Sequence, residues 1–239
     1  MQLSGNRTRP GHLAFAFVSM FSSPASVLAG LKERPRWFYP LAVAALYAAV
    51  VNFYVVTRVG FARLIRDLMQ TAPVVDPQGI LEMALARKLE IQVFQGISTV
   101  ASTFLTALVV AKILWLELEL TGVDVRFRSV LAVVAHVSMF SLVVRESMLA
   151  LTATVMRDLE GLDLRNPLAT NPAFFHHPGS PVFFRLLSSL DLVTLLQIFL
   201  LSLGLSRVST GLSFRKAFLL VIIPWGIYTA VTVLLPIRS

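Results

Sequence analysis

Residues 129–152 read SVLAVVAHVSMFSLVVRESMLALT, a run whose side chains are almost all apolar. A helix needs about 20 residues to cross about 30 Å of hydrocarbon, so this run is long enough to span a bilayer. Comparable runs lie on both sides of it. The sequence therefore predicts an all-α fold, a polytopic membrane protein built as a five-transmembrane-helix bundle. The expected spans are residues 38–56, 93–116, 129–152, 186–205 and 217–237.

The composition supports lipid as the solvent of this chain. Its 239 residues are 56% hydrophobic and 14% charged, and the mean hydropathy is +0.76. A soluble domain carries about 25% charged residues. One helical bundle accounts for the whole length, so we expect a single membrane domain over residues 1–239. The net charge of +8 is explained by cations that flank the apolar runs and face the lipid bilayer, which argues against nucleic acid as a partner.

The sequence lacks the usual marks of an enzyme. It contains no cysteine, which excludes disulfides, thiolate nucleophiles and cysteine metal sites. It also has no HExxH, GxSxG or GxxxxGK[ST] motif. We therefore expect a protein that is not an enzyme and that carries no cofactor and no metal.

The amino-terminal segment, residues 12–36, is predicted to lie on the membrane surface. Its apolar run at 12–21 is also typical of a secretory signal peptide, but Ser22, Ser23 and Pro24 interrupt it. Ser23 favours a helix N-cap and Pro24 suits the first helical position. We expect an interfacial amphipathic helix here. The apolar residues assigned to its membrane face are Phe15, Phe17, Val27 and Leu31.

The distribution of basic residues predicts the orientation. Five cations and one acid precede the first span, and the loop before the last span carries three cations and no acid. Cytoplasmic loops are enriched in Lys and Arg, so both regions are expected in the cytoplasm. An odd number of spans then leaves the carboxyl terminus outside. The loops at 57–92 and 153–185 are expected on the outer side as well.

Charged side chains inside the spans are costly and need a partner or a task. Arg145 and Glu146 lie about six residues before the outer end of the third expected span, and Asp191 lies about six residues after the start of the fourth. All three therefore sit at a similar depth. The spacing predicts an ion pair between Arg145 and Asp191, either as a structural fixture of the bundle or as part of a functional cavity. The full predicted intramembrane polar cluster is Arg145, Glu146, Asp191, Gln95 and Asn52.

Two parts of the chain carry a family resemblance. The first runs from Ser23-Pro24 through ERPRW at 33–37 to Pro40. The second contains ATNP at 169–172, LLSSLDL at 186–192, LGLS at 203–206 and SFRKA at 213–217. Their order and spacing resemble bacterial members of the Yip (Ypt-interacting protein) family.

The resemblance implies five transmembrane helices, a bacterial inner (cytoplasmic) membrane, a cytosolic amino terminus and a carboxyl terminus on the far side. Eukaryotic relatives associate with Rab GTPases in vesicle traffic. A bacterium has no such traffic, so that role is not carried over to this chain.

Three functions compete at this point. The first is a non-enzymatic partner-binding or scaffolding subunit of the Yip type, whose membrane-protein partner is a larger transporter such as an ABC-type exporter. The alternative is a small carrier or lipid-handling protein that uses an outward-facing polar cavity. That alternative requires a cavity that reaches Arg145 and Asp191. The third is membrane bending by the interfacial helix.

Overall fold

The computed structural model describes residues 11–69, 76–156, 166–175 and 180–234, and these form helices and short connections with no strand among them. The helices are α1 (Gly11–Ser22), α2 (Pro24–Ala29), α3 (Phe38–Val59), α4 (Phe61–Met69), α5 (Pro77–Ala86), α6 (Lys88–Leu120), α7 (Phe127–Val155), α8 (Pro172–Phe175), α9 (Pro181–Ser189), α10 (Leu192–Val208) and α11 (Phe214–Leu234).

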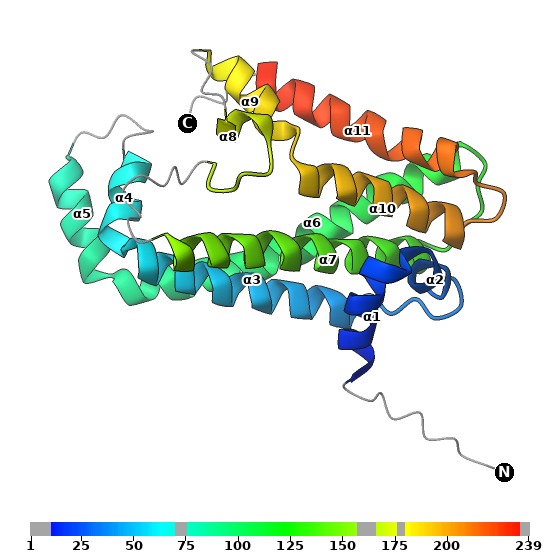
Figure 1. The fold of residues 1–239 in the computed structure, drawn as a ribbon, viewed down its shortest axis with the longest axis horizontal. Helices are drawn as coiled ribbons and strands as arrows, with labels where there is room; N and C mark the ends of the chain where they lie inside the picture. Colours follow the sequence, from blue (N-terminus) through cyan, green and yellow to red (C-terminus); the bar gives the residue numbers. More distant parts are fainter. Residues whose placement is uncertain (1–10, 70–75, 157–165, 176–179, 235–239) are drawn as a thin grey trace, which may run out of the picture.

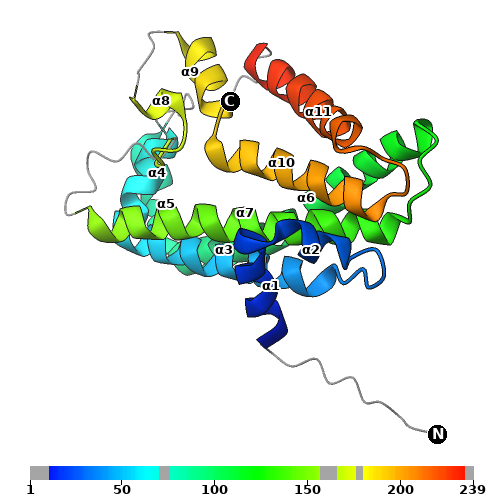
Figure 2. The same ribbon diagram turned by 45° about the vertical axis from the view of Figure 1, so that its right-hand side comes forward.

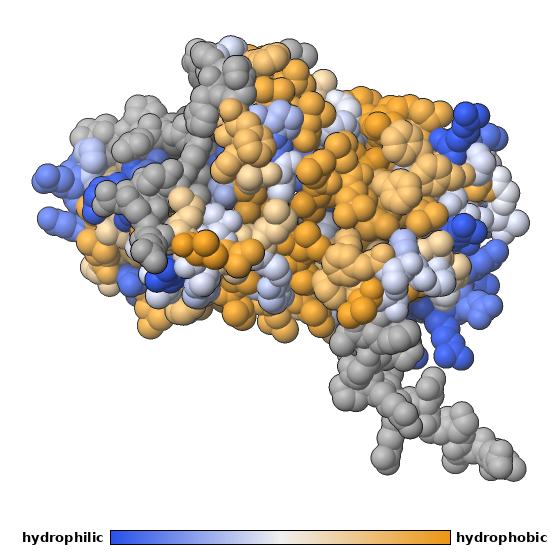
Figure 3. Space-filling model, viewed as in Figure 1, coloured by the Kyte–Doolittle hydropathy of each residue, from blue (hydrophilic) through white to orange (hydrophobic). Residues whose placement is uncertain are grey.

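The long helices make this a multi-pass membrane protein. In the described part of the chain, four single helices are long and apolar enough to cross a bilayer, namely α3, α6, α7 and α11. They contain the expected spans at 38–56, 93–116 and 129–152, and most of the one at 217–237. On the face in Figure 3, apolar side chains cover the middle of the molecule and hydrophilic ones gather at its two ends, as a bilayer-embedded bundle requires.

The expected span at 186–205 is not one straight helix. The chain bends by 48° between Val182–Ser189 and Leu192–Val208, and the two helices reach membrane-spanning length only as a pair. Five crossings result when this broken pair counts as one span. The expected fourth span is therefore interrupted, because a polar side chain at position 191 starts a new helix, as described below.

Helix α7 lies at the centre of the bundle. In Figures 1 and 2 it runs between α3 on one side and α10 on the other, with α11 outside α10. Two thirds of its apolar window is buried, against 17% for α6 and 22% for α11. Helices α6 and α11 therefore leave most of their apolar surface for lipid. We call the end of the bundle where α3, α7 and α11 begin the proximal end, and the opposite end, with α4 and α5, the distal end (Figure 1).

A glycine sets the closest approach in the core. A Cβ atom at Gly204 of α10 would collide with Val133 of α7 and would lie 3.4 Å from a methyl group of Leu28 of α2. All three residues are fully buried or nearly so. Small residues at helix crossings let backbones approach closely in membranes, where packing replaces the hydrophobic effect as the driving force. Gly204 therefore fixes the contact of α2, α7 and α10.

Hydroxyl pairs tie α3 to α7 along their shared face. The Tyr47 hydroxyl lies 2.7 Å from the Ser147 hydroxyl, and the Tyr54 hydroxyl lies 2.7 Å from the Thr154 hydroxyl. The two pairs are seven residues apart on each helix, so they repeat on one face after two turns. Interhelical hydrogen bonds of this kind stabilise bundles in lipid by roughly 0.6–2 kcal/mol each.

The amino-terminal segment docks on the bundle. Pro24 occupies the start of α2, as expected, although the Ser23 side chain makes no capping hydrogen bond. Leu31 is only 5% exposed and belongs to the main core, and Val27 packs against that core. Phe17 of α1 lies 5.7 Å from the Phe140 ring of α7. The Phe15 side chain lies outside the described residues.

The face expected to meet lipid is thus largely covered by protein. The same spacing of apolar residues that predicts a membrane-surface helix also serves a helix that packs on a bundle, and here the bundle is the partner of Val27 and Leu31. The outward side chains of α1 are different ones, Val18 and Phe21, at 63% and 62% exposure.

The tight crossing at Gly204 predicts a position-specific cost. Gly204→Ala forces α10 away from Val133, and overpacking of this kind costs about 1–3 kcal/mol. We expect a lower midpoint of thermal unfolding in detergent. The matched control is Gly96→Ala in α6, where an added Cβ meets nothing within 4 Å and a better helix former replaces glycine. Equal melting points for the two variants would contradict the close packing.

Candidate functional site

A polar cavity of about 240 Å³ lies between α6, α7 and α10. We call it the distal cavity. Nine of its twelve lining residues are polar, which is unusual for the interior of a membrane bundle. The lining consists of Ser102, Thr103, Thr106 and Ala107 from α6, Ser138, Ser141, Leu142 and Arg145 from α7, and Asp191, Val193, Thr194 and Gln197 from the start of α10.

The cavity sits in the distal half of the spans. Arg145 follows the start of α7 at Phe127 by 18 residues, or about 27 Å along the helix. Asp191 precedes the end of α10 at Val208 by 17 residues, or about 26 Å. The two charged residues therefore lie at the same level, as the sequence predicts, and both line the same hollow.

Asp191 builds one wall of the cavity by starting α10. Its Oδ1 accepts hydrogen bonds from the backbone N–H groups of Val193 at 2.6 Å and Thr194 at 3.1 Å. Its Oδ2 accepts one from the Thr170 hydroxyl at 2.6 Å. The backbone N–H of Leu192 donates to the Thr170 carbonyl at 2.9 Å. These bonds satisfy groups that a broken helix would otherwise leave bare in an apolar medium.

The loop that carries Thr170 is itself fixed by side-chain amides. Asn166 and Asn171 exchange two hydrogen bonds, at 3.1 and 2.7 Å, and both residues are buried. The side-chain oxygen Oδ1 of Asn171 also accepts a hydrogen bond from the backbone N–H of Phe174 at 3.2 Å. The sequence predicts turns at Asn166 and Asn171, but not their mutual pairing. Thr170 therefore reaches Asp191 from a loop that is cross-linked by these hydrogen bonds.

The expected ion pair does not form. Arg145 and Asp191 are both described by the structure, and no ion pair joins them. The physical reason is that the Asp191 carboxylate is engaged by the start of α10 and by Thr170. The sequence-based prediction of an Arg145–Asp191 salt bridge was wrong in this respect, although the two residues share a cavity. Arg145 is exposed and lies against a hollow rimmed with hydroxyl groups.

Glu146 lies apart from this hollow. Neighbouring residues on a helix do not face each other, so Arg145 and Glu146 point in different directions. Glu146 is 9% exposed, and within the described residues its buried Oε2 has no hydrogen-bond partner. It does not line the cavity.

The remaining members of the predicted cluster are also outside the cavity. Gln95 is an exposed residue of α6, and Asn52 is a half-buried residue of α3. Gln95 lies seven residues before Ser102 on the same face of α6, so it falls about 10 Å beyond the cavity. Asn52 belongs to α3, which contributes no residue to the lining. The structure gathers Arg145 and Asp191 and leaves Glu146, Gln95 and Asn52 elsewhere.

Several cavity residues were not singled out from the sequence, although a pattern marks them. Ser138, Ser141 and Arg145 are spaced by three and four residues, and Thr194 follows Asp191 by three. Such spacing puts polar side chains on one helix face. Lys112, inside the second expected span and outside the cavity, was also not singled out from the sequence. Its ammonium lies 3.9 Å from the centre of the Trp115 ring.

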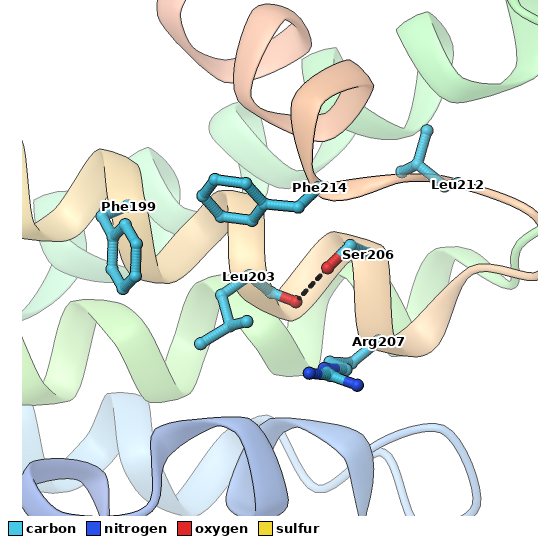
Figure 4. A pocket seen from close by; sticks show the side chains of 6 residues that line it. All are labelled: Phe199, Leu203, Ser206, Arg207, Leu212 and Phe214. Carbon is cyan, nitrogen blue, oxygen red and sulfur yellow. Dashed lines mark hydrogen bonds between the residues drawn. The ribbon is translucent and has the colours of Figure 1, made fainter.

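A second hollow lies at the proximal end, on the α10–α11 hairpin. It is a shallow groove of about 500 Å³, and Figure 4 shows its lining side chains. We call it the proximal groove. It is lined by Phe199, Leu203, Ser206, Arg207, Leu212 and Phe214.

Comparisons with protein-family models, with curated proteins and with solved structures find no match to this chain. Membership of the Yip family, suggested by short motifs, therefore stays a prediction. Functional conclusions depend on the geometry of the two hollows.

The capping role of Asp191 makes a testable distinction between two substitutions. Asn is as good an N-cap as Asp, whereas Ala leaves the first N–H groups of α10 without an acceptor and costs about 0.5–2 kcal/mol. We expect Asp191→Ala to lower the thermal midpoint in detergent and Asp191→Asn to stay close to the wild type. Asp124→Ala, in an exposed loop, is the control. If Asp191→Asn loses as much stability as Asp191→Ala, charge pairing rather than capping dominates.

Proposed function

We propose that this protein is a lipid-handling protein of a bacterial inner membrane, which binds the polar head group of a phospholipid in the distal cavity. The observation that carries this proposal is the position of Arg145. Its guanidinium borders a hollow lined with hydroxyl and amide groups, and no ion pair to Asp191 neutralises it. The hydroxyls of Ser102, Thr103 and Ser141 already donate to backbone carbonyls. The hydroxyls of Thr106, Ser138 and Thr194 remain to join the guanidinium in holding the oxygens of a phosphate group.

The size of the cavity supports a head group rather than a whole molecule. Pockets that enclose a drug-sized ligand measure about 300–1,000 Å³. The distal cavity, at about 240 Å³, is smaller. Helix α6 forms one wall and is mostly uncovered by protein, so a lipid arrives from the side and its acyl chains remain in the bilayer.

The charges of the cavity favour a zwitterionic head group with a phosphate and a primary ammonium. The lining contains one cation, Arg145, and one acid, Asp191. A carboxylate offers about four acceptor positions, and Asp191 uses three of them for its hydrogen bonds to Val193, Thr194 and Thr170. The remaining position suits an ammonium donor while Arg145 holds the phosphate. A purely anionic head group would meet an uncompensated carboxylate.

The charge distribution supports an orientation with the proximal end in the cytoplasm. Basic residues at this end include Lys32, Arg126, Arg207 and Lys216, and cytoplasmic ends are enriched in such residues. The distal end also carries Arg58, Arg63, Arg66, Arg87 and Lys88, interspersed with the acids Asp67, Asp76, Glu82 and Glu90. With the α9–α10 pair as the fourth crossing, the carboxyl terminus lies outside. The distal cavity is then in the outer half of the membrane.

The partner-binding or scaffolding function and the transporter partner expected from the sequence stay predictions. A scaffold needs no polar hollow inside the membrane, whereas a lipid-handling protein does. The cavity between α6, α7 and α10 therefore favours the lipid-handling alternative.

The proposed orientation is testable because the chain has no cysteine to remove. In whole cells with a permeabilised outer membrane, we expect a membrane-impermeant maleimide to label Gln78→Cys in α5. Asp124→Cys, in the α6–α7 loop, is expected to react only after the inner membrane is opened. Both positions are exposed. The reverse labelling pattern would contradict the proposed topology.

The proposed lipid site is tested by native mass spectrometry of the purified protein with phosphatidylethanolamine. Loss of a charged hydrogen bond costs about 1.5–3 kcal/mol, so Arg145→Gln is expected to weaken binding about tenfold or more. Arg87→Gln, an exposed arginine at the start of α6 and outside the cavity, is the matched control. Unchanged lipid binding in Arg145→Gln would overturn the proposal.

A further inference from the structure

The proximal groove runs along α10 from inside the membrane to the end of the helix. Phe199 lies nine residues before the helix end at Val208, or about 14 Å. Leu203 lies one turn further on, and Arg207 stands in the last turn. Phe214, at the start of α11, faces Phe199 across the groove, with ring centres 5.5 Å apart. Figure 4 shows this succession from aromatic rings to guanidinium.

The polar end of the groove has one unengaged donor. The Ser206 hydroxyl donates to the Leu203 carbonyl at 2.8 Å, the bond drawn in Figure 4. Arg207 is exposed and makes no ion pair with any residue that the structure describes. Among the six lining side chains, Arg207 is therefore the one that offers donors to a ligand.

The segments of α10 and α11 that flank the groove are basic. Asp191 is the last acid in the sequence, so neither the rest of α10 nor α11 carries a negative side chain. Arg215 and Lys216 follow the groove, and Lys32 reaches the hairpin loop through a 3.3 Å hydrogen bond to the Thr210 hydroxyl. Glu33 beside Lys32 is the one acid between residues 12 and 36. The other acids at this end, Glu117, Glu119 and Asp124, belong to the end of α6 and the α6–α7 loop, and none of them lines the groove or forms an ion pair with Arg207. The groove itself therefore favours an anion.

We propose that the proximal groove binds an anionic phospholipid from the bilayer leaflet at this end. One acyl chain lies along Phe199, Leu203 and Phe214, and the phosphate meets Arg207 at the level where α10 leaves the membrane. The apolar part continues into α10 side chains that already face outward, including Leu195 and Leu196, so a lipid enters from the bilayer without crossing polar groups.

The net charge separates this site from the distal cavity. The distal cavity balances Arg145 against Asp191, whereas the proximal groove has a cation and no acid. An anionic head group gains attraction at Arg207 and from the neighbouring lysines and arginines. A zwitterionic head group brings an ammonium that those same cations repel. The two hollows are therefore expected to prefer different lipids, and the present inference does not depend on the distal site.

The experiment is a titration of the full-length protein, followed by native mass spectrometry. The probes are phosphatidylglycerol and, separately, phosphatidylethanolamine. Wild type is expected to retain phosphatidylglycerol, and Arg207→Gln is expected to weaken it about tenfold, the effect of one lost charge-assisted contact. Arg126→Gln removes an exposed cation at the same end but outside the groove, and it should bind as the wild type does.

Two further variants keep the result interpretable. Leu203→Trp fills the apolar part without changing the charge and is expected to weaken phosphatidylglycerol binding. Arg145→Gln is expected to leave phosphatidylglycerol binding unchanged. Loss of a lipid from the distal cavity and loss of a lipid from the proximal groove therefore respond to different substitutions. Thermal unfolding checks that each variant is folded.

Three outcomes would overturn the inference. In the first, Arg126→Gln loses as much affinity as Arg207→Gln, which would mean diffuse attraction to the basic end. In the second, both lipids bind the wild type equally and Arg207→Gln changes neither. In the third, a second copy of the chain occupies the groove, seen as a dimer that phosphatidylglycerol does not dissociate and that Leu203→Trp abolishes.

Discussion

The Asp191 carboxylate is the contact on which the described architecture depends. A helix that breaks within a bilayer exposes backbone N–H groups to hydrocarbon, and each unsatisfied group costs several kcal/mol. Asp191 accepts two of these groups and the hydroxyl of Thr170, which a pair of asparagine amides holds in place. The chain can therefore turn by 48° between α9 and α10. The distal cavity lies where this turn draws α10 away from a straight path.

The helices of the bundle differ in how closely they are packed. Helices α2, α7 and α10 meet at Gly204, and α3 is joined to α7 by hydroxyl pairs. Helices α6 and α11 are covered far less, and each borders one of the two hollows. Helix α10 lines both hollows, with Thr194 and Gln197 in the distal cavity and Phe199 and Arg207 in the proximal groove. A single helix thus contributes polar side chains to hollows in both halves of the bundle.

The sequence predicts the membrane class and the position of most spans, because length and apolarity act over 20 residues and tolerate local exceptions. It does not predict the break at Asp191. An acid inside an apolar run is expected to pair with a cation, and that expectation gives no reason for the helix to end there. In the structure the carboxylate instead accepts hydrogen bonds from the first N–H groups of α10 and from Thr170. The serine pair Ser188-Ser189 before Asp191 and the Asn-Pro turn signals on either side of Thr170 are the features of the sequence that mark this arrangement.

Depth was easier to infer than direction. Arg145 and Asp191 lie at one level as expected, but Glu146, Gln95 and Asn52 do not line the cavity that those two residues share. Rotation of a helix about its axis depends on packing, and packing here follows Gly204 and the tyrosine hydroxyls. The amino-terminal segment illustrates the same limit, because the apolar spacing of Val27 and Leu31 fits a protein surface as well as a lipid surface.

The most direct test of the lipid-handling account is an experimental structure of the protein in a nanodisc that contains phosphatidylethanolamine. The account predicts head-group density between α6 and α10, with a phosphate within hydrogen-bonding distance of Arg145 and with Asp191 still capping α10. A closed and empty cavity in which Arg145 pairs directly with Asp191 would contradict it.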